Sequence, residues 1–123
     1  MNLTLDENRA EYHIFSYAPG KVQVNEQFFT NSIIIAPDQL IENWQPQNFN
    51  ELKREHLLQV LPLKPDVLLI GTGAVQQFPP LALYGDLLNQ GIGVEVMDSA
   101  AACRTFNILT AEDRRVVVAL LIN

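Results

Sequence analysis

The sequence predicts an α/β fold, a three-layer sandwich in which helices cover both faces of a mixed, mostly parallel sheet and an N-terminal β-hairpin packs at one side. From residue 48 onward, helical and strand patterns alternate with short connections, which is typical of parallel sheets. Residues 32–37 and 66–71 are continuously apolar, as expected for strands that are covered on both faces. With 123 residues, 48% of them apolar, the chain is predicted to form one domain spanning residues 1–123.

The first third of the chain predicts strands. Residues 12–17 alternate between apolar and polar side chains, and residues 20–29 predict a hairpin with Asn25 and Glu26 at its turn. Residues 32–37 are rich in β-branched side chains and predict a buried strand that ends at its proline.

The next two segments predict a connection and a helix. Residues 38–47 show no clear period and are expected to be irregular. Residues 48–63 carry an apolar stripe at helical spacing, with Asn48 or Asn50 available as N-cap and Pro62 near the end.

The remainder alternates regularly. The pattern predicts strands at 66–71, 92–97 and 114–123 and helices at 80–91 and 98–113. Pro80 lies near the start of the first helix and Gly91 just past its end, the asymmetry that helices favour. The second helix must turn into the last strand within a few residues, so we expect a positive φ at Asp113.

Composition excludes several classes of function. The chain has 8 basic and 14 acidic residues, a net charge of −6, which argues against binding to nucleic acid or to anionic lipid. One cysteine cannot form an intramolecular disulfide. The N-terminal residues do not resemble a signal or transit peptide, and no apolar run is long enough to insert into a membrane. We therefore expect a soluble, cytoplasmic protein.

Two glycines follow the strand predicted at 66–71. Ligands of parallel sheets bind beyond the carboxyl ends of the strands, where Gly71, Thr72 and Gly73 are expected to lie. A dinucleotide-binding turn needs a third glycine, but Gln76 stands in that position, and no phosphate-binding Gly-Lys-Ser/Thr sequence is present. The glycines therefore indicate backbone geometry first and a small ligand pocket second.

The helix that follows residue 97 carries the other candidates. Asp98 or Ser99 can cap it, and Cys103, Arg104 and Asn107 are predicted to share one face with Ala100 and Ala111, while the opposite side is more apolar. The candidate residues for binding a ligand or partner are therefore Gly71, Thr72, Gly73, Asp98, Ser99, Cys103, Arg104 and Asn107.

The chemistry of these residues leaves two interpretations open. Cys103 lies about one turn from a helix N-terminus and beside Arg104, which would lower the pKa of a thiol, but it could equally be a small buried side chain. Arg104 could clamp backbone carbonyls or anchor a substrate. Neither His13 nor His56 is placed to act as a general base for Cys103. Two histidines far apart in the sequence and one cysteine do not make a metal site. We therefore expect no catalytic residue, no metal and no cofactor.

The chain resembles a family of small α/β domains of largely unknown function that includes the mitochondrial respiratory complex I assembly factor 3. The motifs that carry the resemblance are "LLIGTG" at 68–73 and "VEVMDSAAACRTFNILTAEDRRVVVALL" at 94–121, and it extends to "SIIIAP" and Trp44. Three positions depart from the family pattern: Ser99 stands for threonine, Phe106 for tyrosine and Asp113 for glycine.

The resemblance implies a three-layer fold around a mixed sheet whose last strand runs antiparallel, and no established enzymatic activity. The mitochondrial relative acts through protein–protein contacts during assembly. Our first hypothesis is thus a non-enzymatic protein-binding or assembly protein, and the alternative is a small-molecule or anion site, or an enzyme, that uses the glycine loop with Cys103 and Arg104. A homodimer would suit an acidic, apolar-rich domain with an exposed strand edge.

Overall fold

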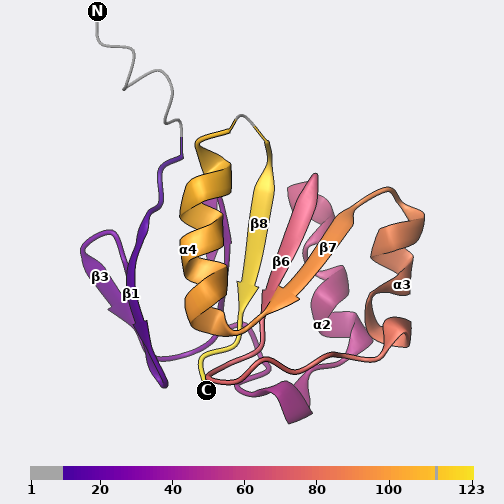
Figure 1. Cartoon of the computed structure of the whole chain (residues 1–123), viewed down its shortest axis with the longest axis horizontal. Helices are drawn as coiled ribbons and strands as arrows, with labels where there is room; N and C mark the ends of the chain where they lie inside the picture. The colour runs from indigo at the N-terminus through magenta and orange to yellow at the C-terminus, as the bar shows by residue number, and fades with distance from the viewer. Residues whose placement is uncertain (1–9, 113) are drawn as a thin grey trace, which may run out of the picture.

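A computed structural model of the chain describes residues 10–112 and 114–123 (Figure 1). Its strands form a three-stranded sheet in the order β1-β2-β3 and a five-stranded sheet in the order β5-β4-β8-β6-β7. The strands are β1 (Ile14–Ala18), β2 (Lys21–Val24), β3 (Gln27–Phe29), β4 (Ile33–Ala36), β5 (Gln39–Ile41), β6 (Val67–Gly71), β7 (Gly93–Met97) and β8 (Val116–Leu120). The helices are η1 (Phe49–Glu51), α2 (Arg54–Leu58), η2 (Leu61–Leu63), α3 (Leu81–Asn89) and α4 (Ser99–Thr110).

The small sheet is formed by the strands predicted in the N-terminal part of the chain. β2 pairs antiparallel with β3 and also with β1. Asn25 has a φ of 53° at the tight turn between β2 and β3, which confirms the predicted hairpin turn. Asp113, where we expected a positive φ, lies outside the described residues.

The large sheet is mixed, as predicted, and the mixed α/β fold class is confirmed. β6 runs parallel to β7 and β8, whereas β4 runs antiparallel to β8 and to β5. Two of its four pairings are antiparallel because β4 alone runs against the other four strands, which all point the same way. The expected irregular connection at 38–47 was wrong in part, because β5 lies within it. β5 has only three residues, too few to show a strand period in the sequence.

The last strand also differs from what the family resemblance implied. β8 is parallel to β6 and antiparallel only to β4, so β4 is the strand that reverses direction. The physical reason is the crossover through α4, which returns the chain to the sheet in the direction of β6 and β7.

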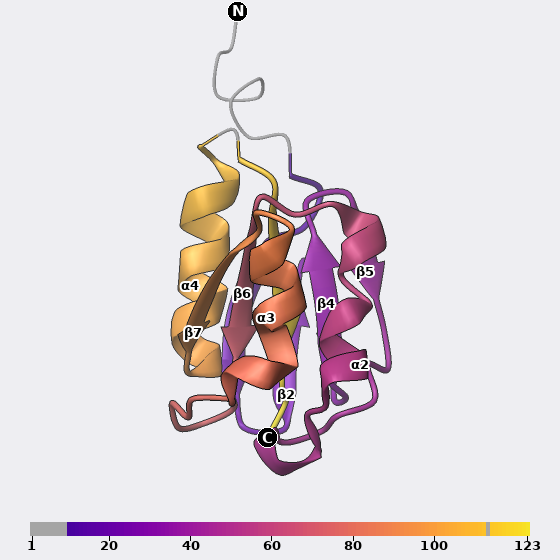
Figure 2. The same cartoon turned by 90° about the vertical axis from the view of Figure 1, so that its right-hand side faces the viewer.

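Alternate residues of the central strands build two apolar cores. Ile33 and Ile35 of β4 pack on one face of the large sheet together with residues of α4 and the small sheet. Ile34 and Ala36 point to the other face, where α2 and α3 contribute Leu57 and Leu87. Figure 2 shows α2 and α3 on the face opposite to α4. β4, β6 and β8 are buried along their whole length, as their continuous apolar sequence predicted.

The predicted helix at 48–63 is broken into η1, α2 and η2. Asn48 caps η1, as expected, by accepting a hydrogen bond from the Glu51 amide. Leu52 and Lys53 are then extended, and a new helix begins where the His56 ring nitrogen Nδ1 accepts from the Lys53 amide at 3.0 Å. His56 is buried, and its carbonyl accepts from the Trp44 indole, so it is a satisfied core histidine.

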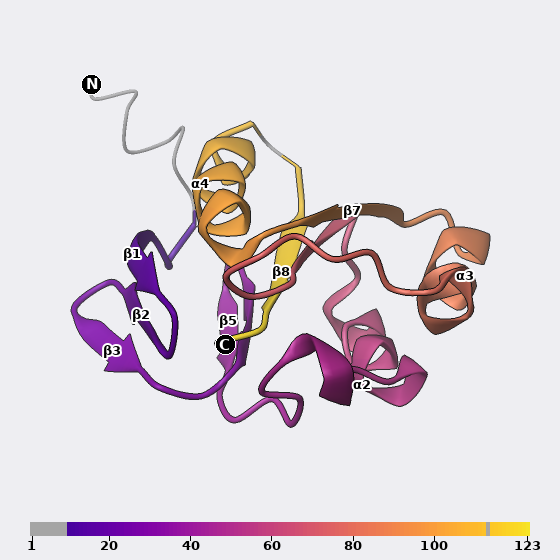
Figure 3. The ribbon, with the colours of Figure 1, turned by 60° about the horizontal axis from the view of Figure 1, so that its bottom comes forward.

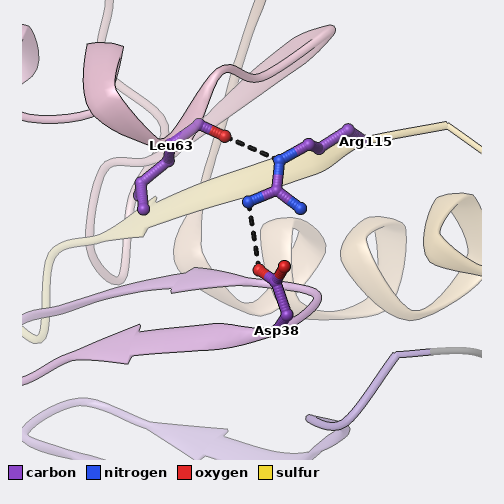
Figure 4. A network of polar contacts seen from close by, with 3 residues as sticks. All are labelled: Asp38, Leu63 and Arg115. Carbon is purple, nitrogen blue, oxygen red and sulfur yellow. Dashed lines mark hydrogen bonds and ion pairs between the residues drawn. The ribbon is translucent and has the colours of Figure 1, made fainter.

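A polar network holds the start of β8 (Figure 4). Nε of Arg115 donates to the Leu63 carbonyl at 2.6 Å, and Nη2 donates to Oδ1 of Asp38 at 3.0 Å. The hydrogen bond from Arg115 lowers the pKa of the Asp38 carboxyl from its usual value. One side chain thereby connects β8 to η2 and to the turn between β4 and β5.

Candidate functional site

The glycine loop meets the start of α4 at one end of the large sheet. Gly71 and Met97 end the parallel strands β6 and β7 in matching register. The Thr72 amide donates to the Met97 carbonyl at 2.9 Å, and the Ser99 amide donates to the Gly73 carbonyl at 2.8 Å. The structure therefore brings the predicted loop and the predicted helix N-terminus together, because parallel strands end at the same edge.

Both glycines are required by the backbone. A Cβ on Gly71 would lie 2.9 Å from the Ser99 hydroxyl oxygen and 2.8 Å from a methyl carbon of Leu120. Gly73 has a φ of +101°, and its Cβ would lie 2.3 Å from the carbonyl oxygen of Asn123. The close approach of α4, of β8 and of the residues that follow β8 thus accounts for both glycines without a ligand.

The two hydroxyl groups of the loop region are bonded within the chain. Oγ of Ser99, which is fully buried, accepts from the Gly73 amide at 2.8 Å and donates to the Leu121 carbonyl at 2.8 Å. Oγ1 of Thr72 donates to the Val75 carbonyl at 2.8 Å and accepts from the Gln77 amide at 3.1 Å. Each hydroxyl therefore stabilises a turn of the backbone.

Asp98 and Asn107 have equally local partners. Oδ1 of Asp98 accepts from the Ala101 amide at 2.8 Å, so Asp98 is the N-cap of α4. Asn107 accepts from the Ile14 amide at 3.0 Å through Oδ1 and donates to the Ile14 carbonyl at 2.7 Å through Nδ2. The Asn107 side chain therefore pairs with the backbone amide and carbonyl of β1 as a neighbouring strand would. The backbone that it binds belongs to the same chain.

The predicted helical face is corrected by the structure. Cys103 belongs to the buried side of α4 with Ala102 and Phe106, and it is only 5% exposed, whereas Arg104 is exposed. Burial raises the pKa of the Cys103 thiol to about 12, and the opposing influence of Arg104 is smaller. The thiol is thus neutral at physiological pH, which matches the reading of Cys103 as a small buried side chain.

A cleft of about 200 Å³ lies between residues of β1 and of α4. Arg104 stands at this cleft and forms no ion pair with any residue that the structure describes. The lining residues are Ile14, Phe15, Ser16, Tyr17, Ala100, Cys103 and Arg104. The glycine loop does not line it, so the predicted site residues divide between a bonded loop cluster and this cleft.

Tyr17 is a residue of the cleft that the sequence did not reveal. Its hydroxyl donates to the Ile122 carbonyl at 3.1 Å, and burial raises its pKa. Its position depends on how β1 lies against α4, a contact between segments far apart in the chain. Nothing in the local sequence signals that contact.

The described residues form neither a metal-binding cluster nor a membrane-spanning helix. The described part of the chain holds no group of three or more His, Cys, Asp or Glu residues that could bind a metal ion. Within residues 10–112 and 114–123, none of the helices has both the length and the apolar character needed to cross a membrane.

Comparison with known proteins decides the family. Residues 14–121 match a family described as "Protein of unknown function (DUF498/DUF598)". The chain belongs to this family. The resemblance inferred from the two sequence motifs is therefore confirmed.

Named relatives differ in their descriptions. The chain is 31% identical over 117 residues to the "13 kDa major membrane protein" of Francisella tularensis subsp. holarctica, covering 93% of this chain and 95% of that protein. It is 31% identical over 110 residues to the zebrafish (Danio rerio) "NADH dehydrogenase [ubiquinone] 1 alpha subcomplex assembly factor 3". That match covers 88% of this chain but only 63% of the zebrafish protein.

A solved structure supports the fold throughout. A crystal structure of a protein from Bordetella parapertussis is 41% identical and superposes with a TM-score of 0.86, covering 93% of this chain and 98% of the other. The small sheet and the large sheet therefore belong to one fold that the Bordetella protein shares.

Proposed function

We propose that this member of the DUF498/DUF598 family is a non-enzymatic protein-binding protein of the assembly-factor type. The observation that carries the proposal is a contrast in exposure. The side chains of Ser99 and Asn107 are hydrogen-bonded to the chain's own backbone, whereas large apolar side chains are exposed between β6 and α3.

We call residues 75–81 the apolar segment. Within it, Val75, Phe78 and Leu81 are 64%, 75% and 61% exposed. Large apolar side chains gathered on a surface are typical of protein-binding sites. Figure 3 shows this connection running along one end of the large sheet toward α3.

The apolar segment is held in place before any partner binds. The Thr72 hydroxyl fixes its first turn, and Nε2 of Gln76 donates to the Val96 carbonyl on the outer edge of β7 at 3.1 Å. Pro79 and Pro80 restrict the backbone that follows. A pre-ordered segment loses less conformational entropy on binding, which favours affinity.

The charge of the chain and the name of a relative both favour a protein as the partner. The net charge of −6 opposes nucleic acid, and the single cysteine, free and buried, suits the reducing cytoplasm, the compartment that we infer. The zebrafish relative is named an assembly factor, and this chain spans 63% of its length. By analogy, we infer a role in assembling a protein complex.

The proposal is tested by measuring whether substitutions in the apolar segment weaken binding to a defined partner protein. Tagged protein would be purified from its own cells, the stoichiometric partner identified, and the complex rebuilt from purified components. The double substitution Val75→Ser with Phe78→Ser should weaken binding by about tenfold or more, because buried apolar anchors dominate interfaces. Leu88→Ser, at an exposed leucine of α3, serves as the control. Unchanged affinity in the double variant would refute the proposal.

A second candidate function is binding of a small anion, or catalysis on one, in the cleft between β1 and α4. It is supported by Arg104, which stands at this cleft without an ionic partner in the described chain. Titration with inorganic phosphate or acetate should then shift the backbone amides of Tyr17 and Ala100, and Arg104→Gln should abolish those shifts. No change in these amides at millimolar anion would count against it.

A further inference from the structure

The outer face of α4 carries a ridge of three exposed side chains. Arg104, Ile108 and Glu112 follow one another at steps of four residues, so they form a continuous row along the helix and its last turn. Ile108 is 61% exposed and lies opposite the buried side formed by Ala102 and Phe106. Figures 1 and 3 show no other element of the described chain over this side of α4.

The two charges of this ridge have no ionic partner among the residues that the structure describes. Positions three and four residues to either side of Arg104 hold only Ala100, Ala101, Asn107 and Ile108, none of which is acidic. Neither Arg104 nor Glu112 forms an ion pair with any described residue. Glu112 also follows the carboxyl end of α4, where the helix dipole disfavours an acidic side chain.

We propose that a second copy of this chain docks on the ridge, with the two α4 helices antiparallel and a two-fold axis at Ile108. Arg104 and Glu112 are each four residues from Ile108, on opposite sides. A two-fold axis through Ile108 therefore places Arg104 opposite the partner's Glu112, and the reverse pair forms at the same time. Ile108 packs on its symmetry mate, and the same row packs against itself.

The side chains that flank the ridge suit a close approach of two helices. Ala101, Thr105 and Ala111 stand beside Ile108 on the outer side of α4 and are all small. A copy of the chain fits better than an acidic protein, because the row contains one charge of each sign. The net charge of −6 makes two copies repel each other in general, so association requires these specific pairs. The pairing should weaken as salt is raised.

The first measurement is sedimentation equilibrium of the full chain at several concentrations and at low and high salt. Ile108→Glu should raise the dimer dissociation constant at least tenfold, because it places two carboxylates at the axis. Leu88→Glu makes the same kind of change on α3, which lies on the other side of the large sheet, and should leave the constant unchanged. A chain that stays monomeric at about 1 mM would overturn the proposal.

A charge exchange makes the test specific to the ridge. Arg104→Glu alone should weaken the dimer about tenfold, since both symmetric pairs become repulsive. Glu112→Arg added to it should restore the original affinity. Lys64→Glu changes the net charge by the same amount at the exposed C-cap of η2 and should have little effect on the dimer. Failure of the double variant to recover, or a dimer indifferent to all these changes, would overturn the proposed geometry.

Discussion

The polar residues of α4 behave differently on its two sides. Ser99 and Asn107 lie on the sides of α4 that face the sheets. The Ser99 side chain is hydrogen-bonded to the backbone of the loop after β6 and of the residues after β8, and the Asn107 side chain to the backbone of β1. Arg104, on the outer side, and Glu112, in the turn that follows α4, have no ionic partner in the described chain. The first pair organises the fold, and the second remains available to another molecule.

This difference shows why a polar motif at a helix N-terminus is weak evidence for a binding site. The end of a parallel sheet exposes backbone amides and carbonyls that need partners once they are buried. Ser99 and Asp98 supply those partners here, so their presence beside two glycines follows from the requirements of the fold. The predictions below test each side in turn.

The largest effect is expected at the glycine loop. Gly73→Ala should lower the free energy of unfolding by about 3 kcal/mol or more, because the backbone has a positive φ and the new methyl group would meet the carbonyl of Asn123. Gly85→Ala is the matched control, since nothing lies within 4 Å of its added Cβ in α3. It should raise stability by up to about 1 kcal/mol. Urea denaturation measures both, and a Gly73→Ala protein as stable as the parent would contradict the role of the loop.

The second effect concerns the buried hydroxyl. Ser99→Ala should cost about 2–3 kcal/mol, because the Gly73 amide and the Leu121 carbonyl both lose a partner. Thr105→Ala on the same helix, where the side chain is only half-buried, should change stability by less than about 0.5 kcal/mol. Thermal or urea unfolding compares the two variants. Equal losses of stability would contradict a specific contribution of the Ser99 hydroxyl.

The third effect depends on pH. Burial raises the pKa of Cys103 from 9.0 to about 12, so the unfolded chain releases this proton at a lower pH than the folded chain. Relative to Cys103→Ala, the parent should therefore lose stability as pH rises from about 9 toward 12, by up to about 1.4 kcal/mol per pH unit. The contribution is fully present below pH 9.

Thiol alkylation gives an independent reading of the same residue. Between pH 5 and pH 9, Cys103 should react only after the protein is denatured, because its side chain is buried and neutral in that range. Fast labelling of the folded protein with a midpoint below about pH 8.5 would mean an accessible thiolate. The anion-binding or enzymatic alternative would then replace the proposal of a protein-binding function.

The smallest effect is expected on the outer side of α4. Arg104→Ala should change the free energy of unfolding of the monomer by less than about 0.5 kcal/mol, because the guanidinium has no ionic partner in the described chain. The measurement needs dilute protein, where no dimer forms. A loss above about 1 kcal/mol would show that Arg104 serves the fold, and the contrast between the two sides of α4 would fail.

Much of the fold was predictable because its signals are local. The strands at 32–37, 66–71, 92–97 and 114–123 were predicted from continuous or β-branched apolar runs, and they correspond to β4, β6, β7 and β8. The helices at 80–91 and 98–113 were equally clear and correspond to α3 and α4. β5 was missed, because its three residues acquire a strand conformation only by pairing with β4.

The candidate site was predicted in part. A cap at Asp98 or Ser99 and the turn at Gly71–Gly73 follow from residue type and position alone, and the structure shows that Asp98 is the cap. The side of α4 on which Cys103 lies was assigned wrongly, since α4 carries many small residues and its apolar stripe is weak. Only packing against β1, β6 and β8 decides how far the helix is rotated about its axis.

By itself, the sequence determined most of the strands, the helices α3 and α4, the family and the backbone turn at Gly73, because each is signalled by residues close together in the chain. Tertiary structure alone decided that β4 reverses the sheet, that Asn107 holds β1, and that Cys103 is buried while Arg104 is not. Each of these depends on contacts between segments far apart in the chain. The free energy of such a contact comes from burial and from pairing buried polar groups, and neither can be assigned until the neighbours are known.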